Sequence, residues 1–219
     1  MIDIAKIRGD ALVLAPDMDE GRIDAALEIA QFLGQYGLTR TRDRYGSERI
    51  ANIHISRNSA RLPSCTIHDS ESDMYIKSYK HTVDAELQYR TMNVLYRRLA
   101  RQDVGVRAVR HLAVLENGQM RPTAVIEPAV GESVQRSVCT YMERRVLAKD
   151  IAGRLDMVLG SVTRRILIND IERSTNMAGN LNRDDAGVYH LYDQPFIYRD
   201  ARYLRMRAAL QWLEMTTPE

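Results

Sequence analysis

Lysine is scarce in this sequence, and two of its four lysines, Lys77 and Lys80, fall in or beside one short apolar and aromatic segment, Met74–Tyr79. The segment is rich in residues that favour β-strands. Arginine supplies most of the positive charge elsewhere, so two lysines in one segment invite an explanation. A lysine ammonium can act as a point charge on a phosphate group. Because strand side chains alternate, Lys77 and Lys80 point to opposite faces, and at most one can serve such a site.

Three successive antiparallel strands are expected around these lysines, at Ile50–Ile55, Cys65–His68 and Met74–Tyr79, because each is β-branched or aromatic and turn-rich segments separate them. The strongest helix prediction follows at Val83–Ala100. Its apolar residues recur on one face, and Thr82 is placed to cap it. This order of elements places the strand that carries Lys77 directly before a helix.

Two further strands are predicted at His111–Leu115 and Thr123–Ile126, because Asn117-Gly118 between them supplies the positive φ angles of a tight hairpin. Beyond Gly131 the pattern becomes mostly helical. The expected elements there are helices over about Val134–Leu159 and over Ala201–Met215, with short apolar segments Arg165–Ile168 and Val188–Tyr192 between them.

The N-terminal part is expected to be a helical extension. Apolar residues recur at helical spacing through Asp19–Leu33, and the polar segment Leu38–Tyr45 then reads as a connector, with a boundary near Gly46. A chain of 219 residues can bury one substantial core plus such an extension.

Composition excludes several classes of protein. No apolar run approaches the roughly 20 residues of a membrane-spanning helix, and no conventional secretory signal is visible, so we expect a soluble protein without a membrane span. The two cysteines, Cys65 and Cys139, form no paired-thiol or zinc motif, which favours a reducing compartment. A net charge of +2 with interleaved acids argues against nucleic-acid binding.

The predicted order of three strands, one helix, two strands and a helical half resembles the protein-kinase-like fold over about Glu48–Pro195. The resemblance implies an α+β, two-lobed protein-kinase-like fold. It would consist of an N-terminal helical extension (1–47), an antiparallel-sheet N-lobe (48–130) and a reduced helical C-lobe (131–219). It also implies ATP and Mg²⁺ as cofactors, because phosphoryl transfer needs a cation on the phosphates, metal-binding oxygens and a carboxylate base.

In this resemblance, Lys77 in Tyr75-Ile-Lys-Ser-Tyr79 is similar to the third-strand lysine that binds the nucleotide phosphates, with Lys80 as the alternative. Glu86, in the first turns of the next helix, is similar to the acid that pairs with that lysine. A surface lysine and a solvated helix glutamate are the alternative explanations.

The segment Val125–Ser133 resembles the hinge that grips adenine. This implies that the carbonyl of Glu127 and the N–H of Ala129 face the base, while Pro128 falls where no donor is needed. An ordinary strand exit is the alternative.

The corresponding phosphate loop is Ser56–Pro63, which lacks the glycines that let a backbone approach phosphate closely. Ser59 is the candidate phosphate-binding residue, and Arg57 or Arg61 could supply charge. A second register, through Tyr45-Gly46-Ser47, leaves a long connection to Lys77.

The segment Arg165–Met177 resembles the catalytic loop, which implies Asp170 as the carboxylate that orients or deprotonates the substrate hydroxyl and Asn176 as a magnesium ligand. It departs from the family pattern in three ways. Ile168 and Asn169 replace the usual histidine and arginine, and Asn176 lies one residue farther from Asp170 than expected. A polar helix-to-loop turn is the alternative.

The segment Leu191–Pro195 resembles the strand that ends in the magnesium-binding aspartate, here Asp193, with Gln194-Pro195 in place of Phe-Gly. Magnesium prefers such hard oxygen ligands. An aspartate that begins a turn is the alternative.

Little sequence follows Asp193, so the resemblance is to minimal kinases. These include bacterial type III effectors delivered into host cells, among them the group that phosphorylates the host 90-kDa heat-shock chaperone. The comparison implies a virulence-associated serine/threonine kinase with a protein substrate, that chaperone being one candidate. It also implies signal-peptide-independent secretion into the host cytosol. Three alternatives stay open: a catalytically inactive pseudokinase-like binding module, a small-molecule kinase, and an unrelated α+β domain.

Overall fold

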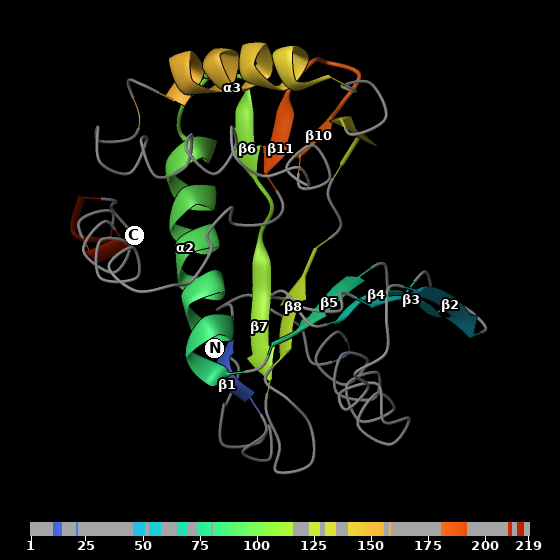
Figure 1. The fold of residues 1–219 in the computed structure, drawn as a ribbon. Coiled ribbons are helices and arrows are strands. Elements are labelled where there is room, and N and C mark those ends of the chain that lie inside the picture. The colour runs from blue at the N-terminus through green and yellow to red at the C-terminus, as the bar shows by residue number, and fades with distance from the viewer. Residues whose placement is uncertain are drawn as a thin grey trace. The chain divides into compact units, whose positions relative to one another are not determined.

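The computed structural model describes residues 11–14, 21, 46–50, 53–57, 65–69, 74–79, 81–115, 123–127, 130–134, 140–155, 158, 181–191, 210–211 and 214–216. They form an α+β structure with one antiparallel sheet, one mixed sheet and helices (Figure 1). The chain divides into two compact units. The first comprises Met1–Tyr89 with His111–Pro128, and the second comprises Arg90–Arg110 with Ala129–Glu219.

In the first unit the described strands form a seven-stranded antiparallel sheet in the order β1-β7-β8-β5-β4-β3-β2. Strand β8 therefore lies between β5 and β7. The strands, in chain order, are β1 (Ala11–Leu14), β2 (Gly46–Ile50), β3 (Ile53–Arg57), β4 (Cys65–Asp69), β5 (Met74–Ser78), β7 (His111–Leu115) and β8 (Thr123–Ile126).

The predicted β4, β5, β7 and β8 are confirmed to within about a residue, and β7 and β8 pair antiparallel as the Asn117-Gly118 hairpin requires. The predicted strand Ile50–Ile55 is wrong, because it spans the connection between β2 and β3. Ile50 pairs with Ile53, so only two residues separate these strands. These residues are Ala51 and Asn52, and a single asparagine is a weaker turn signal than a pair that contains glycine or proline.

Strand β1 was not predicted. Ala11–Leu14 pairs antiparallel with β7, so part of the predicted N-terminal extension belongs to the sheet. Its four apolar residues follow a common strand pattern, but periodicity cannot distinguish so short a run from a buried helix turn. The predicted helix over Asp19–Leu33 lies outside the described residues except for Gly21.

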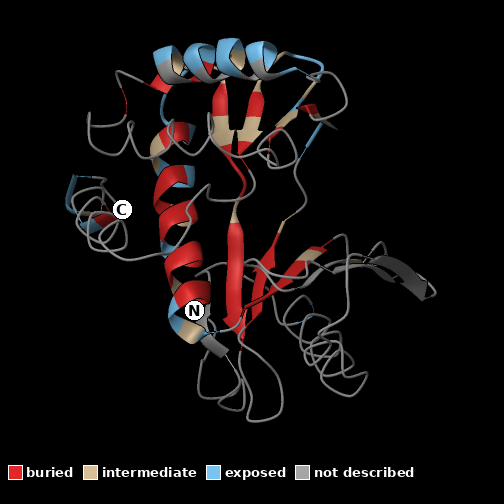
Figure 2. Cartoon of the chain, viewed as in Figure 1, coloured by how far each residue is buried: buried red, intermediate tan, exposed pale blue. Residues whose placement is uncertain are grey.

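The centre of the sheet is buried on both faces (Figure 2). Ile76 on β5 lies opposite Val125 on β8, which lies opposite Ala113 on β7. Cross-strand partners share a face, so these buried apolar residues form one row of the core. Buried central strands lack the alternation of a half-exposed sheet, and both faces must be covered by other parts of the chain.

The helix prediction at Val83–Ala100 is confirmed by α2 (Thr82–Ala100). The division between the two units falls within this helix, at residues 89 and 90. A stripe of fully buried residues recurs every three or four positions along it, at Ala85, Gln88, Met92, Leu95 and Leu99.

The second unit contains a smaller mixed sheet in the order β6-β11-β10-β9, formed by β6 (Val106–Ala108), β9 (Glu132–Ser133), β10 (Leu181–Arg183) and β11 (Tyr189–Leu191). Strand β11 pairs antiparallel with β10 and parallel with β6. The predicted strand at Val188–Tyr192 is confirmed by β11. The other three strands were not predicted, because each has only two or three residues and therefore no measurable period.

Helix α3 (Tyr141–Leu155) is shorter than the predicted Val134–Leu159. The reason is a capping box at its start. The hydroxyl of Thr140 accepts a hydrogen bond from the N–H of Glu143 at 3.2 Å, and the Glu143 carboxylate accepts one from the N–H of Thr140 at 2.7 Å. These reciprocal bonds fix the first turn of α3. Glu132 and Ser133, which directly precede the predicted helical range, form β9.

The division into units differs from the ranges expected from the sequence, since residues 90–110 belong to the second unit rather than to an N-lobe. The predicted segment Arg165–Ile168 lies outside the described residues. Of Ala201–Met215, the described residues 210–211 and 214–215 are helical, as is residue 216. Within the described residues, no helix combines the length and apolarity that crossing a membrane would require.

Candidate functional site

Lys77 lies on β5 in the middle of the first unit's sheet, with only 3% of its surface exposed. It is opposite Thr66 on β4 and Ala124 on β8. Burying an ammonium is costly unless other groups engage it, and Lys77 does interact with other groups of the chain. The alternative of a surface lysine is therefore wrong for Lys77.

Helix α2 is joined to β7 of the first unit's sheet by one buried side-chain contact. His111 on β7 lies opposite Ile126 on β8, next to an irregularity of β7 between His111 and Ala113. A side-chain nitrogen of Gln88 on α2 hydrogen-bonds to Nε2 of His111 at 3.1 Å. Gln88 and His111 are 1% and 0% exposed, so this contact is fully inside the core.

Sequence reasoning missed this pair and named Glu86 instead. Glu86 lies in the second turn of α2 and is half-buried. It is two residues from Gln88, or about 200° around the helix, so the two side chains leave α2 on different sides. The burial stripe through Ala85, Gln88 and Met92 was a usable signal, because a polar residue within an apolar stripe must have a buried partner.

Glu127 follows β8 directly and is half-buried. Because β8 pairs with β5, the chain leaves the sheet beside the strand that carries Lys77, with Ala124 opposite Lys77 and Ile126 opposite Tyr75. The structure thus places Lys77 on β5 and Glu127 directly after β8, the strand that pairs with β5. The other predicted site residues lie outside the described residues: Ser59, Ala129, Asp170, Asn176 and Asp193.

A charged network organises the β10–β11 turn in the second unit. The Asp184 carboxylate accepts hydrogen bonds from Nε2 of His190 at 2.9 Å and from the N–H of Val188 at 2.8 Å. The bond from His190, followed by the one from Val188, holds the pKa of Asp184 below its ordinary value. The left-handed Gly187, at φ 80°, closes the turn by donating its N–H to the Asp184 carbonyl at 2.9 Å.

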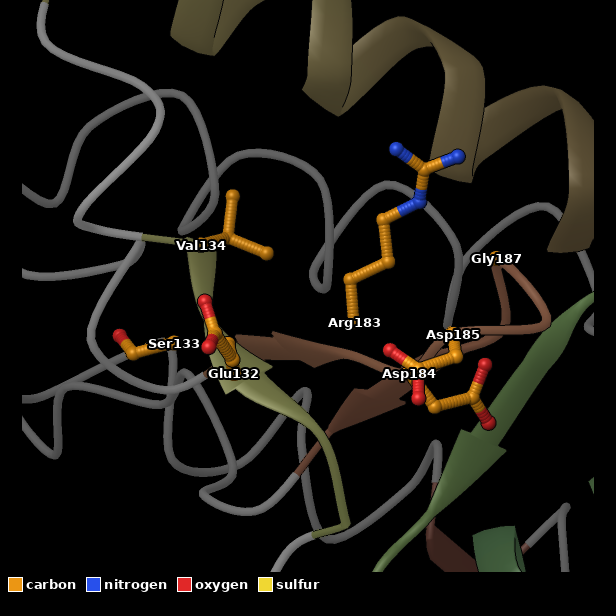
Figure 3. Close-up of a pocket in the computed structure, with 7 residues that line it drawn as sticks. All are labelled: Glu132, Ser133, Val134, Arg183, Asp184, Asp185 and Gly187. Carbon is orange, nitrogen blue, oxygen red and sulfur yellow. The ribbon is translucent and has the colours of Figure 1, made fainter.

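The same turn borders a pocket of about 510 Å³ (Figure 3). Its lining residues come from β9 and from β10 and the turn that follows: Glu132, Ser133, Val134, Arg183, Asp184, Asp185 and Gly187. Figure 3 shows the guanidinium of Arg183 directed away from the two aspartates. A carboxylate with a depressed pKa and two internal hydrogen bonds is a poor proton acceptor, so Asp184 stabilises the turn rather than acting as a base.

Two guanidinium groups flank Tyr189 of β11. Those of Arg154 on α3 and Arg183 on β10 lie 5.3 and 5.6 Å from the centre of its ring. Both distances suit cation–π attraction, which joins α3 to the small sheet. Both arginines therefore contribute to the packing of the second unit.

Within the ranges that the structure describes, no three histidine, cysteine or acidic side chains are grouped so that they could hold a metal ion. The predicted magnesium ligands, Asn176 and Asp193, lie outside those ranges. The metal prediction therefore remains a prediction.

Comparison with known proteins gives no relative: no protein-family model and no curated protein matches the chain.

Proposed function

We propose that the chain is an ATP-dependent protein kinase of minimal type, of the serine/threonine class, which transfers the γ-phosphate of ATP to a protein hydroxyl. The observation that carries the proposal is Lys77. It is a buried lysine on β5, the last of the four consecutive antiparallel strands β2 to β5 and the strand directly before α2.

The order of elements around Lys77 supports the same proposal. Helix α2 follows β5, and the hairpin of β7 and β8 follows β6, with β8 returning to pair with β5. This connection brings the exit of β8, where Glu127 lies, next to the lysine strand. A cation and the backbone groups after β8 would then flank one nucleotide, the cation near the phosphates and the backbone near the base.

The proposed division of roles is as follows. Lys77 and Ser59 would bind phosphate oxygens, and the backbones of Glu127 and Ala129 would bind adenine. Bound Mg²⁺ would supply positive charge at the transferring phosphate, with Asn176 and Asp193 as its ligands. Asp170 would accept the proton of the attacking hydroxyl. Glu86 would pair with the ammonium of Lys77 and fix its position.

The first experiment is thermal unfolding with ATP, with and without Mg²⁺. A ligand that binds only the folded chain raises its midpoint. We expect a magnesium-dependent rise in the wild type, and its loss in Lys77→Met and Asp193→Ala. The matched control is Lys149→Met, which removes an exposed lysine on α3. A rise that persists unchanged in Lys77→Met would contradict the proposed site, provided that the variant without ligand is folded.

A second experiment addresses transfer. Labelled phosphate should pass from ATP to an added protein, with a 90-kDa heat-shock chaperone as the first candidate and a set of unrelated proteins for comparison. Asp170→Asn should abolish transfer while the nucleotide-dependent rise is retained. Transfer at wild-type rate by this variant would rule out Asp170 as the base.

A pseudokinase-like binding module is the second candidate, favoured by one feature of the sequence. The segment Ser56–Pro63 between β3 and β4 holds no glycine that would let its backbone approach phosphate closely. A nucleotide-dependent rise without transfer to any protein tested would favour this candidate over an active kinase.

A further inference from the structure

Within the second unit, two residues near the C-terminus, Glu214 and Thr216, contact α2. The guanidinium of Arg90 donates from Nε to one carboxylate oxygen of Glu214 at 2.9 Å and from Nη2 to the other at 2.7 Å. This two-point geometry is the stronger form of an arginine–carboxylate pair. The two residues are 124 positions apart in sequence, so the contact closes a long loop of chain.

A second contact lies farther along the helix. Nη1 of Arg98 donates to the hydroxyl of Thr216 at 2.7 Å, while Nε of the same guanidinium donates to the carbonyl of Val158 at 2.6 Å. Arg90 and Arg98 are eight residues apart, or about 12 Å along the helix axis. Glu214 contacts Arg90 and Thr216 contacts Arg98, so two neighbouring positions of one helical segment meet two positions of α2.

Apolar burial accompanies the two polar contacts. Leu210 and Val158 are 4% and 5% exposed, although Met215, between the two polar contacts, is 79% exposed. A buried leucine is thus followed in the sequence by one charged contact and one hydroxyl contact with α2. An isolated exposed ion pair contributes little to stability. An ion pair accompanied by a buried apolar residue and a second hydrogen bond can hold a segment in place.

We propose that Glu214 and Thr216 form a strap that holds α2 in its observed position, and that Glu214 is a positioning residue acting through Arg90. Arg90 is one helical turn beyond Glu86 and two residues beyond Gln88 on the same continuous helix. Order imposed at Arg90 and Arg98 is therefore passed along the helix to the turn that contacts β7. The consequence for nucleotide binding rests on the proposed function, whereas the strap itself does not.

Hydrogen exchange of α2 in the full chain tests the strap without any ligand. Glu214→Gln removes the charge, and Glu214→Arg places a repelling guanidinium beside Arg90. We expect amides of residues 90–100 to exchange about two- to fivefold faster in Glu214→Gln and faster still in Glu214→Arg, since exposed pairs of this kind alter local equilibria by such factors. Met215→Ala, the neighbouring exposed position, should leave exchange unchanged.

Exchanging the two charges separates pairing from a general loss of structure. The double variant Arg90→Glu with Glu214→Arg restores opposite charges and should return α2 exchange close to that of the wild type. Equal exchange in the wild type, Glu214→Gln and Glu214→Arg would overturn the proposal. So would failure of the double variant to recover when Glu214→Arg alone exchanges faster.

The ATP titration distinguishes this inference from the proposed function. If the strap positions the nucleotide site, Glu214→Arg should weaken ATP binding and the charge-exchanged variant should restore it. Faster α2 exchange with no ATP-dependent rise in any variant, wild type included, would refute the proposed function and leave the strap standing. Normal ATP binding in Glu214→Arg despite faster exchange would refute the positioning role of Glu214.

Discussion

The carboxylate of Asp184 binds Nε2 of His190 across the turn between β10 and β11, at 2.9 Å. Since an ionised carboxylate only accepts hydrogen bonds, Nε2 must carry the proton in this contact. The other carboxylate oxygen accepts from the N–H of Val188. One side chain therefore ties the first residue of the turn to its last residue and to the strand beyond, and these hydrogen bonds are strongest while the carboxylate is charged.

This relationship predicts an acid-dependent loss of stability. Because the folded pKa of Asp184 lies below its unfolded value, near 3.9, the stabilisation is present above that value and is lost as the pH falls through the folded pKa. Asp184→Asn should be less stable than the wild type at pH 7, and the difference should shrink below about pH 4. Urea unfolding at pH 3 to 7 measures this, with Asp185→Asn as the control. A difference that does not change with pH would contradict the prediction.

Asp84, in the first turn of α2, should change the folding stability with pH in the opposite direction to Asp184. Burial raises its pKa, partly offset by the charge of His81. A raised folded pKa means that the native state gains stability as the pH falls and loses it as the pH rises through that pKa. Asp84→Asn should therefore be at least as stable as the wild type at pH 7. As the pH falls to about 4 and below, the wild type should gain stability relative to Asp84→Asn. The exposed Asp103→Asn is the control in the same titration.

Adding one methyl group at Gly131 should destabilise the folded protein. Its φ is 83°, and a Cβ there would lie only 2.4 Å from the carbonyl oxygen of Arg183, so neither conformation nor space allows a side chain. Gly131→Ala should cost about 2 kcal/mol or more. Gly153→Ala on α3 is the matched control, because no atom lies within 4 Å of its Cβ position. That change should stabilise by about 0.5–1 kcal/mol. Thermal unfolding that ranks the two glycines equally would contradict this reading of Gly131.

The buried contact between Gln88 and His111 predicts non-additive substitutions. Gln88→Leu removes a polar partner from a fully buried ring and should destabilise by about 1–3 kcal/mol. The double variant Gln88→Leu with His111→Leu removes both polar groups and should lose less than the sum of the single variants. Denaturant unfolding of the four proteins gives the coupling energy. Additive losses would show that the contact contributes nothing beyond packing.

Long or strongly marked elements could be predicted from the sequence. Helix α2 has five turns of apolar spacing, and the β7–β8 hairpin has the Asn-Gly signal between apolar strands. Strands β2, β9 and β10 could not be predicted, because short strands acquire their conformation from their pairing partners rather than from their own residues. Lys77 was singled out because lysine is scarce and because its segment resembles the lysine strand of the kinase-like fold. Its burial at 3% is consistent with that choice but does not test its role.

The amino-acid sequence by itself determined where local propensity is strong, namely the strand around Lys77, the helix that follows it and the hairpin after that. Only the tertiary structure decided that β8 lies between β5 and β7, that Gln88 rather than Glu86 is the polar group of α2 fully buried against β7, and that Glu214 reaches Arg90 across 124 residues. The physical reason is that propensity and periodicity act over a few neighbouring residues. Strand order, burial and long-range ion pairs depend on which surfaces the whole chain brings together.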